Sequence, residues 1–154
     1  MVDFEDIRSR TTNVRGYIDE LTDKDKDIML EMYNEYELDA SVVDELKDYG
    51  QLTVIAFSAA WCKDCKNAMP VMLRLEEQLD WHILVFSKIK TDPLNPDVQW
   101  KVPPSPPEAN DWGITAIPWF EFFDSSGEKV GTLIEKPQVK ETLEAEILYV
   151  LKNK

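Results

Sequence analysis

The sequence predicts an α/β domain in which helices cover both faces of a mixed four-stranded sheet, with a helical extension at the N-terminus. Two observations predict the sheet. A β-branched run, a helical pattern and a second β-branched run follow one another over residues 51–89, and this order implies a right-handed parallel crossover. Two strand-like runs on either side of "DSSG", residues 124–127, add an antiparallel hairpin. Helical patterns before and after this block supply the covering layers.

Size and composition are those of one globular domain. A chain of 154 residues is long enough to bury a core, and 44% hydrophobic with 31% charged residues is ordinary for a folded protein. The formal net charge is -13 at pH 7, and no basic cluster offsets it. Because this charge repels phosphate backbones and anionic lipid surfaces, we expect neither nucleic acid nor membrane among the partners.

The compartment follows from the N-terminus and the cysteines. The first residues, "MVDFEDIRSR", contain no apolar stretch and carry acids early, unlike a secretory signal. The longest nearly apolar run, "LTVIAFSAAW", is far too short to span a bilayer. We therefore expect a cytoplasmic protein. In a reducing compartment, two cysteines three positions apart are not expected to be a structural staple, since they close almost no loop.

The N-terminal third is predicted to be helical. Residues 22–36 carry apolar side chains at helical spacing, and Thr22 with Asp25 is a capping pair at their start. The same logic predicts a second helix over residues 39–50. Residues 1–38 are accordingly predicted as a helical extension packed on the core, where their apolar stripe finds a partner.

Changes in the spacing of apolar residues predict the central and C-terminal elements. "QLTVIAF" and "HILVFSKI" predict buried strands, and residues 65–79 between them place apolar side chains on one helical face. Pro70 lies inside that pattern and predicts a kink. In the hairpin, Gly127 is the expected positive-φ position. A last helix is predicted to begin at Pro137 and to continue to the C-terminus, with one apolar stripe made by Val139, Leu143, Ile147 and Leu151.

A proline-rich loop follows the second strand. Residues 91–108 hold six of the nine prolines, which predicts a loop of polyproline character. Because neighbouring parallel strands end at the same edge of a sheet, this loop leaves the sheet on the side of Cys62. We expect the loop, with Trp100, to restrict which proteins reach that cysteine.

The stretch "AAWCKDCKNAMP" holds both cysteines, Cys62 and Cys65, and several interpretations compete for them. A structural zinc site needs four soft ligands, whereas the chain offers two cysteines and His82, which is far away in sequence. A metal site shared by two chains stays open, as does simple burial of two small apolar side chains.

Redox chemistry is the interpretation that the position of the pair favours. Cys62 lies between a strand end and a helix start, where unpaired helix N–H groups and the helix dipole stabilise a thiolate. Cys65 lies one helical turn further on, where its sulfur can meet that of Cys62. This arrangement predicts a dithiol/disulfide couple at the end of a strand.

Several motifs together resemble those of the thioredoxin family, over about residues 40–152. "AAWCKDCK" resembles the W-C-x-x-C-K active site of that family, and Pro70 matches its helix-kinking proline. "ANDWGITAIP" matches the segment that ends in its cis-proline, here Pro118. "SKIKTD" matches the strand whose lysine, here Lys88, lies beneath the active site. The resemblance implies a thioredoxin-like fold, with residues 39–154 as the thioredoxin-like domain.

The resemblance also implies an activity. The protein would be a thiol–disulfide oxidoreductase that reduces protein disulfides and takes part in electron transport, without a bound cofactor or metal. Cys62 would be the attacking thiolate and Cys65 the resolving thiol, and the two would form a disulfide bond in each cycle. A disulfide reductase or a small thiol would supply the electrons.

Further site residues are implied by the same resemblance. A cis peptide at Ile117–Pro118 would present backbone groups to an extended substrate, and Trp61 would be an aromatic wall beside the cysteines. Three more residues are expected to support the pair: Lys63, Asp64 and Lys88.

Three departures from the family pattern stand out. Lys63–Asp64 replaces the usual Gly-Pro between the cysteines; the lysine favours the thiolate and the aspartate opposes it. The buried acid that helps to deprotonate the resolving cysteine falls, by spacing, at Ala56. Another base is then needed, such as Asp64 or a water near Lys88. The glycine that opens the substrate groove is here Glu135.

Two alternative functions remain from other classes. One is a thioredoxin-fold binding or chaperone module that uses the groove without redox turnover, and the other is a metal-handling dithiol protein. Insulin reduction separates the first from an oxidoreductase, and elemental analysis separates the second.

Overall fold

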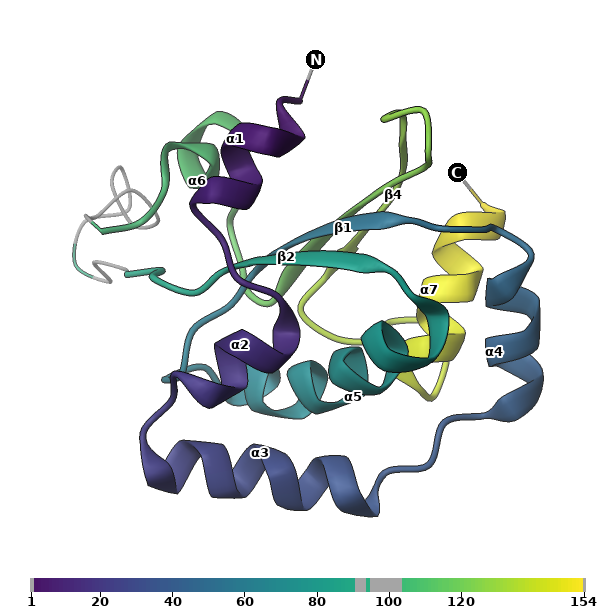
Figure 1. The fold of residues 1–154 in the computed structure, drawn as a ribbon, viewed down its shortest axis with the longest axis horizontal. Helices are drawn as coiled ribbons and strands as arrows, with labels where there is room; N and C mark the ends of the chain where they lie inside the picture. The colour runs from purple at the N-terminus through teal and green to yellow at the C-terminus, as the bar shows by residue number, and fades with distance from the viewer. Residues whose placement is uncertain (1, 91–93, 95–103, 154) are drawn as a thin grey trace.

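The computed structural model describes residues 2–90, 94 and 104–153, and within these ranges it contains seven helices and four strands (Figure 1). In chain order the elements are α1 (Phe4–Ser9), α2 (Val14–Asp19), α3 (Asp23–Glu35), α4 (Ala40–Lys47), β1 (Thr53–Phe57), α5 (Lys63–Leu79), β2 (His82–Phe86), α6 (Pro107–Asp111), β3 (Trp119–Phe123), β4 (Lys129–Ile134) and α7 (Leu143–Lys152). None of the helices in the described ranges is long and apolar enough to cross a membrane.

The four strands form one mixed sheet in the order β2-β1-β3-β4. β1 and β2 run parallel, whereas β3 is antiparallel to both of its neighbours, β1 and β4. The parallel pair results from the crossover through α5, and the antiparallel pair is the hairpin, in which Gly127 adopts a φ of 85°. The predicted mixed four-stranded sheet is confirmed.

Helices cover both faces of this sheet, as predicted. On one face α5 lies against the strands, α3 packs on the outer side of α5, and α7 and α4 lie beside them (Figure 1). The opposite face is covered by α1 and α6 (Figure 1). The alternation of side chains along β1 separates the two cores: Val54 and Ala56 join the cluster on the α5 side, and Ile55 and Phe57 join the other.

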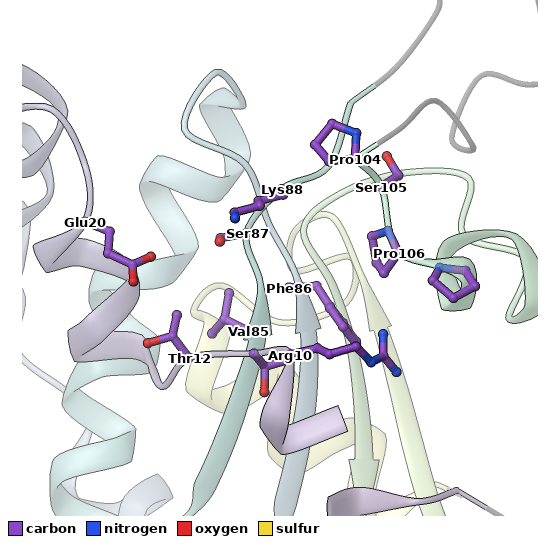
Figure 2. Close-up of a pocket in the computed structure, with 12 residues that line it drawn as sticks. Arg10, Thr12, Glu20, Val85, Phe86, Ser87, Lys88, Pro104, Ser105 and Pro106 are labelled. Atoms are coloured by element: carbon purple, nitrogen blue, oxygen red, sulfur yellow. The ribbon is translucent and has the colours of Figure 1, made fainter. Parts of the chain in front are cut away.

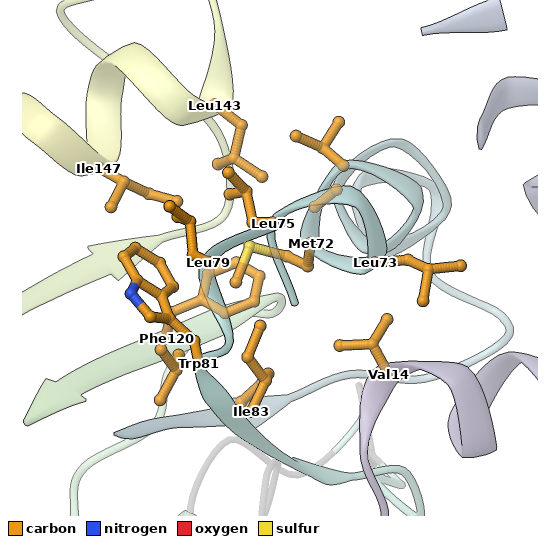
Figure 3. Close-up of a cluster of buried hydrophobic side chains, with 14 of the residues drawn as sticks. Val14, Met72, Leu73, Leu75, Leu79, Trp81, Ile83, Phe120, Leu143 and Ile147 are labelled. Atoms are coloured by element: carbon orange, nitrogen blue, oxygen red, sulfur yellow. The ribbon is translucent and has the colours of Figure 1, made fainter. Parts of the chain in front are cut away.

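The larger core fills the space between α5 and the sheet. Figure 3 shows side chains of α5 meeting residues from α2, β2, β3 and α7. Leu73 points toward Val14 of α2, while Leu79 lies near Trp81 and Ile147 (Figure 3). The N-terminal segment is thus part of the same core as the sheet.

The predicted helices of the N-terminal third are confirmed. α3 begins directly after Thr22, whose side chain accepts a hydrogen bond from the backbone N–H of Asp25. The structure adds α1 and α2, which the sequence analysis did not predict. Each has only six residues, so neither shows the repeated apolar spacing from which longer helices are recognised.

Specific hydrogen bonds hold the N-terminal segment on the sheet and on α5. Thr12 pairs with Val85 at the open edge of β2, with N···O distances of 3.2 and 2.7 Å. The Glu76 carboxylate accepts from the N–H groups of Val14 and Arg15, which are free donors at the start of α2. Burial raises the pKa of Glu76. These contacts position α2, whereas the predicted domain boundary between residues 38 and 39 stays a prediction.

The start of the last helix was predicted wrongly. α7 begins at Leu143 after its N-cap Thr142, not at Pro137, and Val139 is 58% exposed instead of lying on the buried stripe. The reason is a tertiary hydrogen bond pattern: the buried Glu146 carboxylate accepts from the N–H groups of Val139 and Lys140 at 3.0 and 2.8 Å. That binding holds the backbone before Thr142 out of the helix.

Much of the proline-rich loop, including Trp100, lies outside the described residues, so its predicted role at the active site stays a prediction. Its last part forms α6, which starts after Pro106. Glu108 of α6 accepts a hydrogen bond from Arg10 at 3.0 Å, so the end of the loop is tied to the N-terminal segment.

Candidate active site

Cys62 caps the N-terminus of α5. β1 ends at Phe57, a short turn follows, and the Cys62 Sγ atom accepts a hydrogen bond from the backbone N–H of Cys65 at 3.2 Å. Cys62 is 8% exposed, so only a small part of the residue reaches the surface. An N-cap sulfur faces free N–H groups and the positive end of the helix dipole, which both favour a thiolate.

Cys65 lies one turn deeper and is fully buried. Both cysteines are free thiols in the structure. Burial raises the pKa of Cys65, and its hydrogen bond to Cys62 raises it further. The two thiols therefore have opposite characters: one is prepared to ionise near neutral pH, and the other retains its proton.

The pKa of Cys62 is lowered from its usual value to about 7. The largest cause is the hydrogen bond from the Cys65 side chain, and the backbone N–H groups of Cys65 and Asp64 add to it. Burial and the charge of Asp64 act in the opposite direction. The opposing effect predicted for Asp64 is therefore present, whereas Lys63 is exposed and is not among the main causes.

The loop before β3 faces the cysteines. The peptide bond between Ile117 and Pro118 is cis, which is the isomer that the sequence analysis expected. The Ile117 carbonyl accepts a hydrogen bond from the Cys62 Sγ atom at 3.5 Å, and both loop residues are buried. The structure thus brings Cys62, Cys65, Ile117 and Pro118 together, as predicted.

Trp61 forms an exposed surface beside this opening. Its side chain is 57% exposed, although its Nε1–H donates to the Ile89 carbonyl at 3.1 Å. This hydrogen bond holds the indole ring in one place while leaving its ring available for contact. The arrangement fits the predicted aromatic wall.

Lys88 is not where the resemblance implied. Its side chain is exposed and, with Arg10, Glu20 and residues of the loop before α6, lines a cavity of about 410 Å³ at the end of β2 (Figure 2). The reason is that β2 ends at Phe86, so the chain has already left the sheet at Lys88. A position beneath the cysteines was therefore a wrong expectation for this side chain.

The other two departures from the family pattern have clear structural counterparts. Ala56 is fully buried in the middle of β1, opposite Val85 and Phe120, so no carboxylate occupies this place. Glu135 has a φ of 65°, a left-handed conformation that glycine adopts at lower cost. Its backbone N–H donates to the Pro118 carbonyl at 2.7 Å, which places it next to the cis-proline loop.

The structure also adds two residues that the sequence analysis missed. Ser58 follows β1, and its hydroxyl donates to the Tyr17 hydroxyl of α2 at 2.9 Å, in a fully buried position. The Ser58 side chain also acts, through a hydrogen bond, to lower the pKa of Cys65 against the larger effect of burial. No local motif relates Tyr17 to the cysteines; the alternation along β1 could have placed Ser58 on the same face as Ala56.

Metal ligands are scarce around the pair. Within the described part of the chain, no group of three or more His, Cys, Asp and Glu side chains is arranged to hold a metal ion. His82 begins β2 and is exposed, and its imidazole bonds to Gln51. A metal bound by these two thiols would need ligands from elsewhere.

The pH dependence of Cys62 alkylation is a first prediction. Because only the thiolate reacts, the rate constant with iodoacetamide should rise with pH and reach half of its plateau near pH 7. One pH unit lower it should be roughly a tenth of the plateau. Cys65 should remain almost unmodified over the same range. A half-plateau near the ordinary thiol value of about 8.5 would contradict the proposed environment.

Comparisons with known proteins agree with this geometry. The sequence profile described as Thioredoxin matches residues 11–102. The thioredoxin of Porphyra purpurea is 33% identical over 96 residues, covering 62% of this chain and 78% of that protein. The thioredoxin of Pongo abelii is 32% identical over 97 residues, covering 63% of this chain and 77% of that protein.

Two further similarities concern a longer protein and a fold. The chloroplastic thioredoxin-like protein HCF164 of Arabidopsis thaliana is 29% identical over 92 residues, or 59% of this chain; the chain spans only 31% of that protein's length. A crystal structure of a Pseudomonas aeruginosa protein of unknown function superimposes with a TM-score of 0.76 at 11% identity, over 99% of both chains. That likeness shows the fold alone. With a profile match over more than half of its length, and thioredoxins aligned over more than three quarters of theirs, the chain belongs to the thioredoxin family.

Proposed function

We propose that this protein is a thiol–disulfide oxidoreductase that reduces protein disulfides through the couple of Cys62 and Cys65. The observation that carries the proposal is the pairing of two unlike thiols at the start of α5. Cys62 is 8% exposed and has a pKa near 7, whereas Cys65 is fully buried one helical turn further on. Two-step thiol–disulfide exchange requires this difference in pKa, because one thiol is ionised for the first attack and the other stays protonated until the second.

The reaction proceeds in two displacements. The Cys62 thiolate attacks one sulfur of the target disulfide, a new S–S bond forms, and the other target sulfur leaves as a thiolate. Cys65 then attacks the Cys62 sulfur, which forms the Cys62–Cys65 disulfide and releases the second target thiol. Two electrons have moved to the target, so the oxidised protein needs a reductant before the next cycle.

The surroundings of Cys62 determine how a target can approach. Because Cys62 is only 8% exposed, a target disulfide reaches it past the neighbouring groups, which include the exposed Trp61 ring and the Ile117 carbonyl. In the thiol form the Cys62 S–H donates to the Ile117 carbonyl; the thiolate has no proton to donate. Ionisation of Cys62 therefore frees that carbonyl to accept a hydrogen bond from an extended segment of the target.

The partners and the compartment belong to the same proposal. The targets are disulfides in proteins, and the electron donor is a disulfide reductase or a small thiol. We place this activity in the cytoplasm, where a dithiol without a structural disulfide is kept reduced. Fractionation of cells that express the full chain tests the location.

Turnover of insulin disulfides with dithiothreitol as the electron source tests the function. An oxidoreductase accelerates insulin precipitation in proportion to its concentration, and prior alkylation of Cys62 removes the effect. A protein that binds reduced insulin without accelerating its reduction would instead be a binding or chaperone module. Metal found in stoichiometric amount after purification under reducing conditions would favour the metal-handling alternative.

The direction of electron flow depends on the reduction potential of the pair. For a two-electron couple, about 30 mV corresponds to about 1.4 kcal/mol, so modest changes around the cysteines alter the direction. Titration of the couple against glutathione measures the potential. A value more reducing than the glutathione pool supports a reductase, and a clearly more oxidising value would contradict that direction.

A further inference from the structure

The second displacement presents a chemical difficulty in this protein. Cys65 must lose its proton to attack Cys62, yet it is fully buried and its burial favours the protonated form. Ala56, the residue of β1 that precedes Ser58 on the same face, carries no group that could assist. The buried charge that forms on Cys65 needs a hydrogen-bond donor in its place.

Ser58 is positioned to be that donor. It lies directly after β1, it is fully buried, and its backbone N–H is fixed by the Phe86 carbonyl at 3.0 Å. Continuing the side-chain alternation of β1 by one residue places Ser58 on the side of Val54 and Ala56, which α5 covers, and Cys65 is in the first turn of α5. The Ser58 side chain acts to lower the pKa of Cys65, which is the direction expected of a group that donates a hydrogen bond to the thiolate.

Tyr17 completes the arrangement from outside the sheet. α2 is fixed at its start by Glu76 and directs Tyr17 into the core, where the ring is 1% exposed. The Tyr17 hydroxyl accepts from the Ser58 hydroxyl at 2.9 Å. A phenylalanine would fill the same space without a polar group, so the hydroxyl itself calls for an explanation.

The two hydroxyls can exchange the direction of their hydrogen bond. Each is both a donor and an acceptor, and only rotation about a C–O bond separates the two states. While Cys65 is a thiol, Ser58 donates to Tyr17. If Tyr17 donates to Ser58 instead, the Ser58 proton is free to point at the Cys65 sulfur.

We propose that Tyr17 and Ser58 form a hydroxyl relay that stabilises the Cys65 thiolate during the second displacement, an inference that rests on the proposed oxidoreductase function. Ser58 is the residue that touches the reacting sulfur, and Tyr17 is a positioning residue that acts through Ser58. Helix α2 of the N-terminal segment thereby contributes a positioning residue to the active site.

The relay reverses the direction in which the two hydroxyls donate their hydrogen bond, and it uses up no proton and no electron. The Cys65 sulfur gives up its proton and forms a bond to the Cys62 sulfur, and the bond between Cys62 and the target sulfur breaks. The departing target thiolate takes up one proton, either the one that Cys65 lost or one from the buffer. Tyr17 and Ser58 end the step with the protons they had at its start.

Titratable groups of the described residues act on both ends of the relay. Burial raises the pKa of Tyr17, the hydrogen bond with Ser58 lowers it, and the charges of Cys65, Cys62 and Asp25 of α3 raise it. Asp25 is in turn paired with Lys66 of α5 at 3.3 Å, so its charge is partly neutralised. On the other side of the pair, Asp64 faces Cys62. These groups stay unchanged in the substitutions below.

Ellman's reagent separates the two displacements in one experiment. Attack by the Cys62 thiolate releases one thionitrobenzoate and leaves the second on Cys62; attack by Cys65 then releases the second. In Tyr17→Phe we expect the first release to stay within about twofold of wild type, because Cys62 does not touch Tyr17. The second should slow about tenfold, the effect of one lost hydrogen bond to a buried charge. Its pH profile should also move to higher pH, because an unassisted Cys65 ionises later.

Ser58→Ala provides a second variant that does not depend on how Tyr17→Phe folds. We expect it to slow the second release at least as much. The double variant should be no slower than Ser58→Ala within about twofold, since the two hydroxyls act in series. The matched control is Tyr36→Phe, which removes another partly buried tyrosine hydroxyl, bonded to Glu144 at 2.6 Å and outside the active site. It should change neither release.

The outcomes separate this inference from the function on which it rests. A wild-type protein that releases no thionitrobenzoate in the first phase would refute the proposed function. Normal first and second releases in Tyr17→Phe and Ser58→Ala, with an unmoved pH profile, would refute the relay alone. Equal slowing of both releases would also refute it, because that result indicates a purely structural role for the hydroxyls.

Discussion

Replacing Cys62 with serine should abolish disulfide reduction, and replacing Cys65 with serine should convert the protein into a trap for its targets. The serine hydroxyl at position 62 is not ionised at neutral pH, so the first displacement cannot begin. At position 65 the first displacement still occurs, because the serine hydroxyl can donate the hydrogen bond that the Cys65 side chain gave to Cys62, and the helix N–H groups remain. The mixed disulfide then accumulates, since no buried thiol resolves it.

The measurement is insulin turnover combined with non-reducing electrophoresis. Cys62→Ser should leave turnover at the uncatalysed background and form no adducts. Cys65→Ser should also lose turnover but form adducts that dithiothreitol dissolves. The matched control is Asn67→Ala, an exposed position on the same helix two residues after Cys65, which should keep wild-type activity. Adducts formed equally by both serine variants would mean that the roles of the two cysteines have been assigned wrongly.

Replacing Ala56 with aspartate should lower the free energy of unfolding by about 1–3 kcal/mol or more at neutral pH, the cost of burying an unpaired polar or charged group. Ala56 is fully buried and lies in the middle strand region between Val85 of β2 and Phe120 of β3. A carboxyl there has its pKa raised above the ordinary value of about 4, because burial disfavours the charged form.

The sign of the pH dependence follows from that raised pKa. Below about pH 4 the carboxyl is protonated in both states, and Ala56→Asp should be about as stable as its neutral isostere Ala56→Asn. As pH rises, the unfolded chain ionises first, so the aspartate variant should lose stability relative to the asparagine variant until the folded-state pKa is passed. Denaturant midpoints over this range measure the difference. Unchanged midpoints would show that position 56 is not buried.

The same variant offers a functional measurement. By side-chain alternation, position 56 shares its face of the sheet with Ser58. An added carboxylate there accepts the proton of Cys65, whereas the relay only stabilises the thiolate that remains. We expect the second release of thionitrobenzoate to become faster in Ala56→Asp, while the first stays unchanged. Slower resolution in a correctly folded variant would place the added carboxyl away from Cys65.

Much of the fold follows from short-range patterns in the sequence. β-Branched runs predict β1 and β2, the "DSSG" turn predicts the hairpin, and apolar spacing over fifteen or so residues predicts α3 and α5. The position of Cys62 at the start of a helix is also local information. It accounts for the lowered pKa of Cys62, because the Cys65 side chain and the helix N–H groups that lower it belong to the same segment.

Tertiary structure alone decided the remaining features, since each depends on groups that are distant in sequence. Glu146 holds the chain out of the helix before Leu143, where the local pattern favoured an earlier start. The end of β2 places Lys88 on the surface. The meeting of Tyr17 with Ser58 requires a six-residue helix, too short to be recognised by period, that is fixed on α5 by Glu76. Local sequence patterns therefore determined the position of the cysteine pair at the start of α5 and the sheet beside it. Packing of the N-terminal segment determined which side chains surround the buried Cys65 thiol.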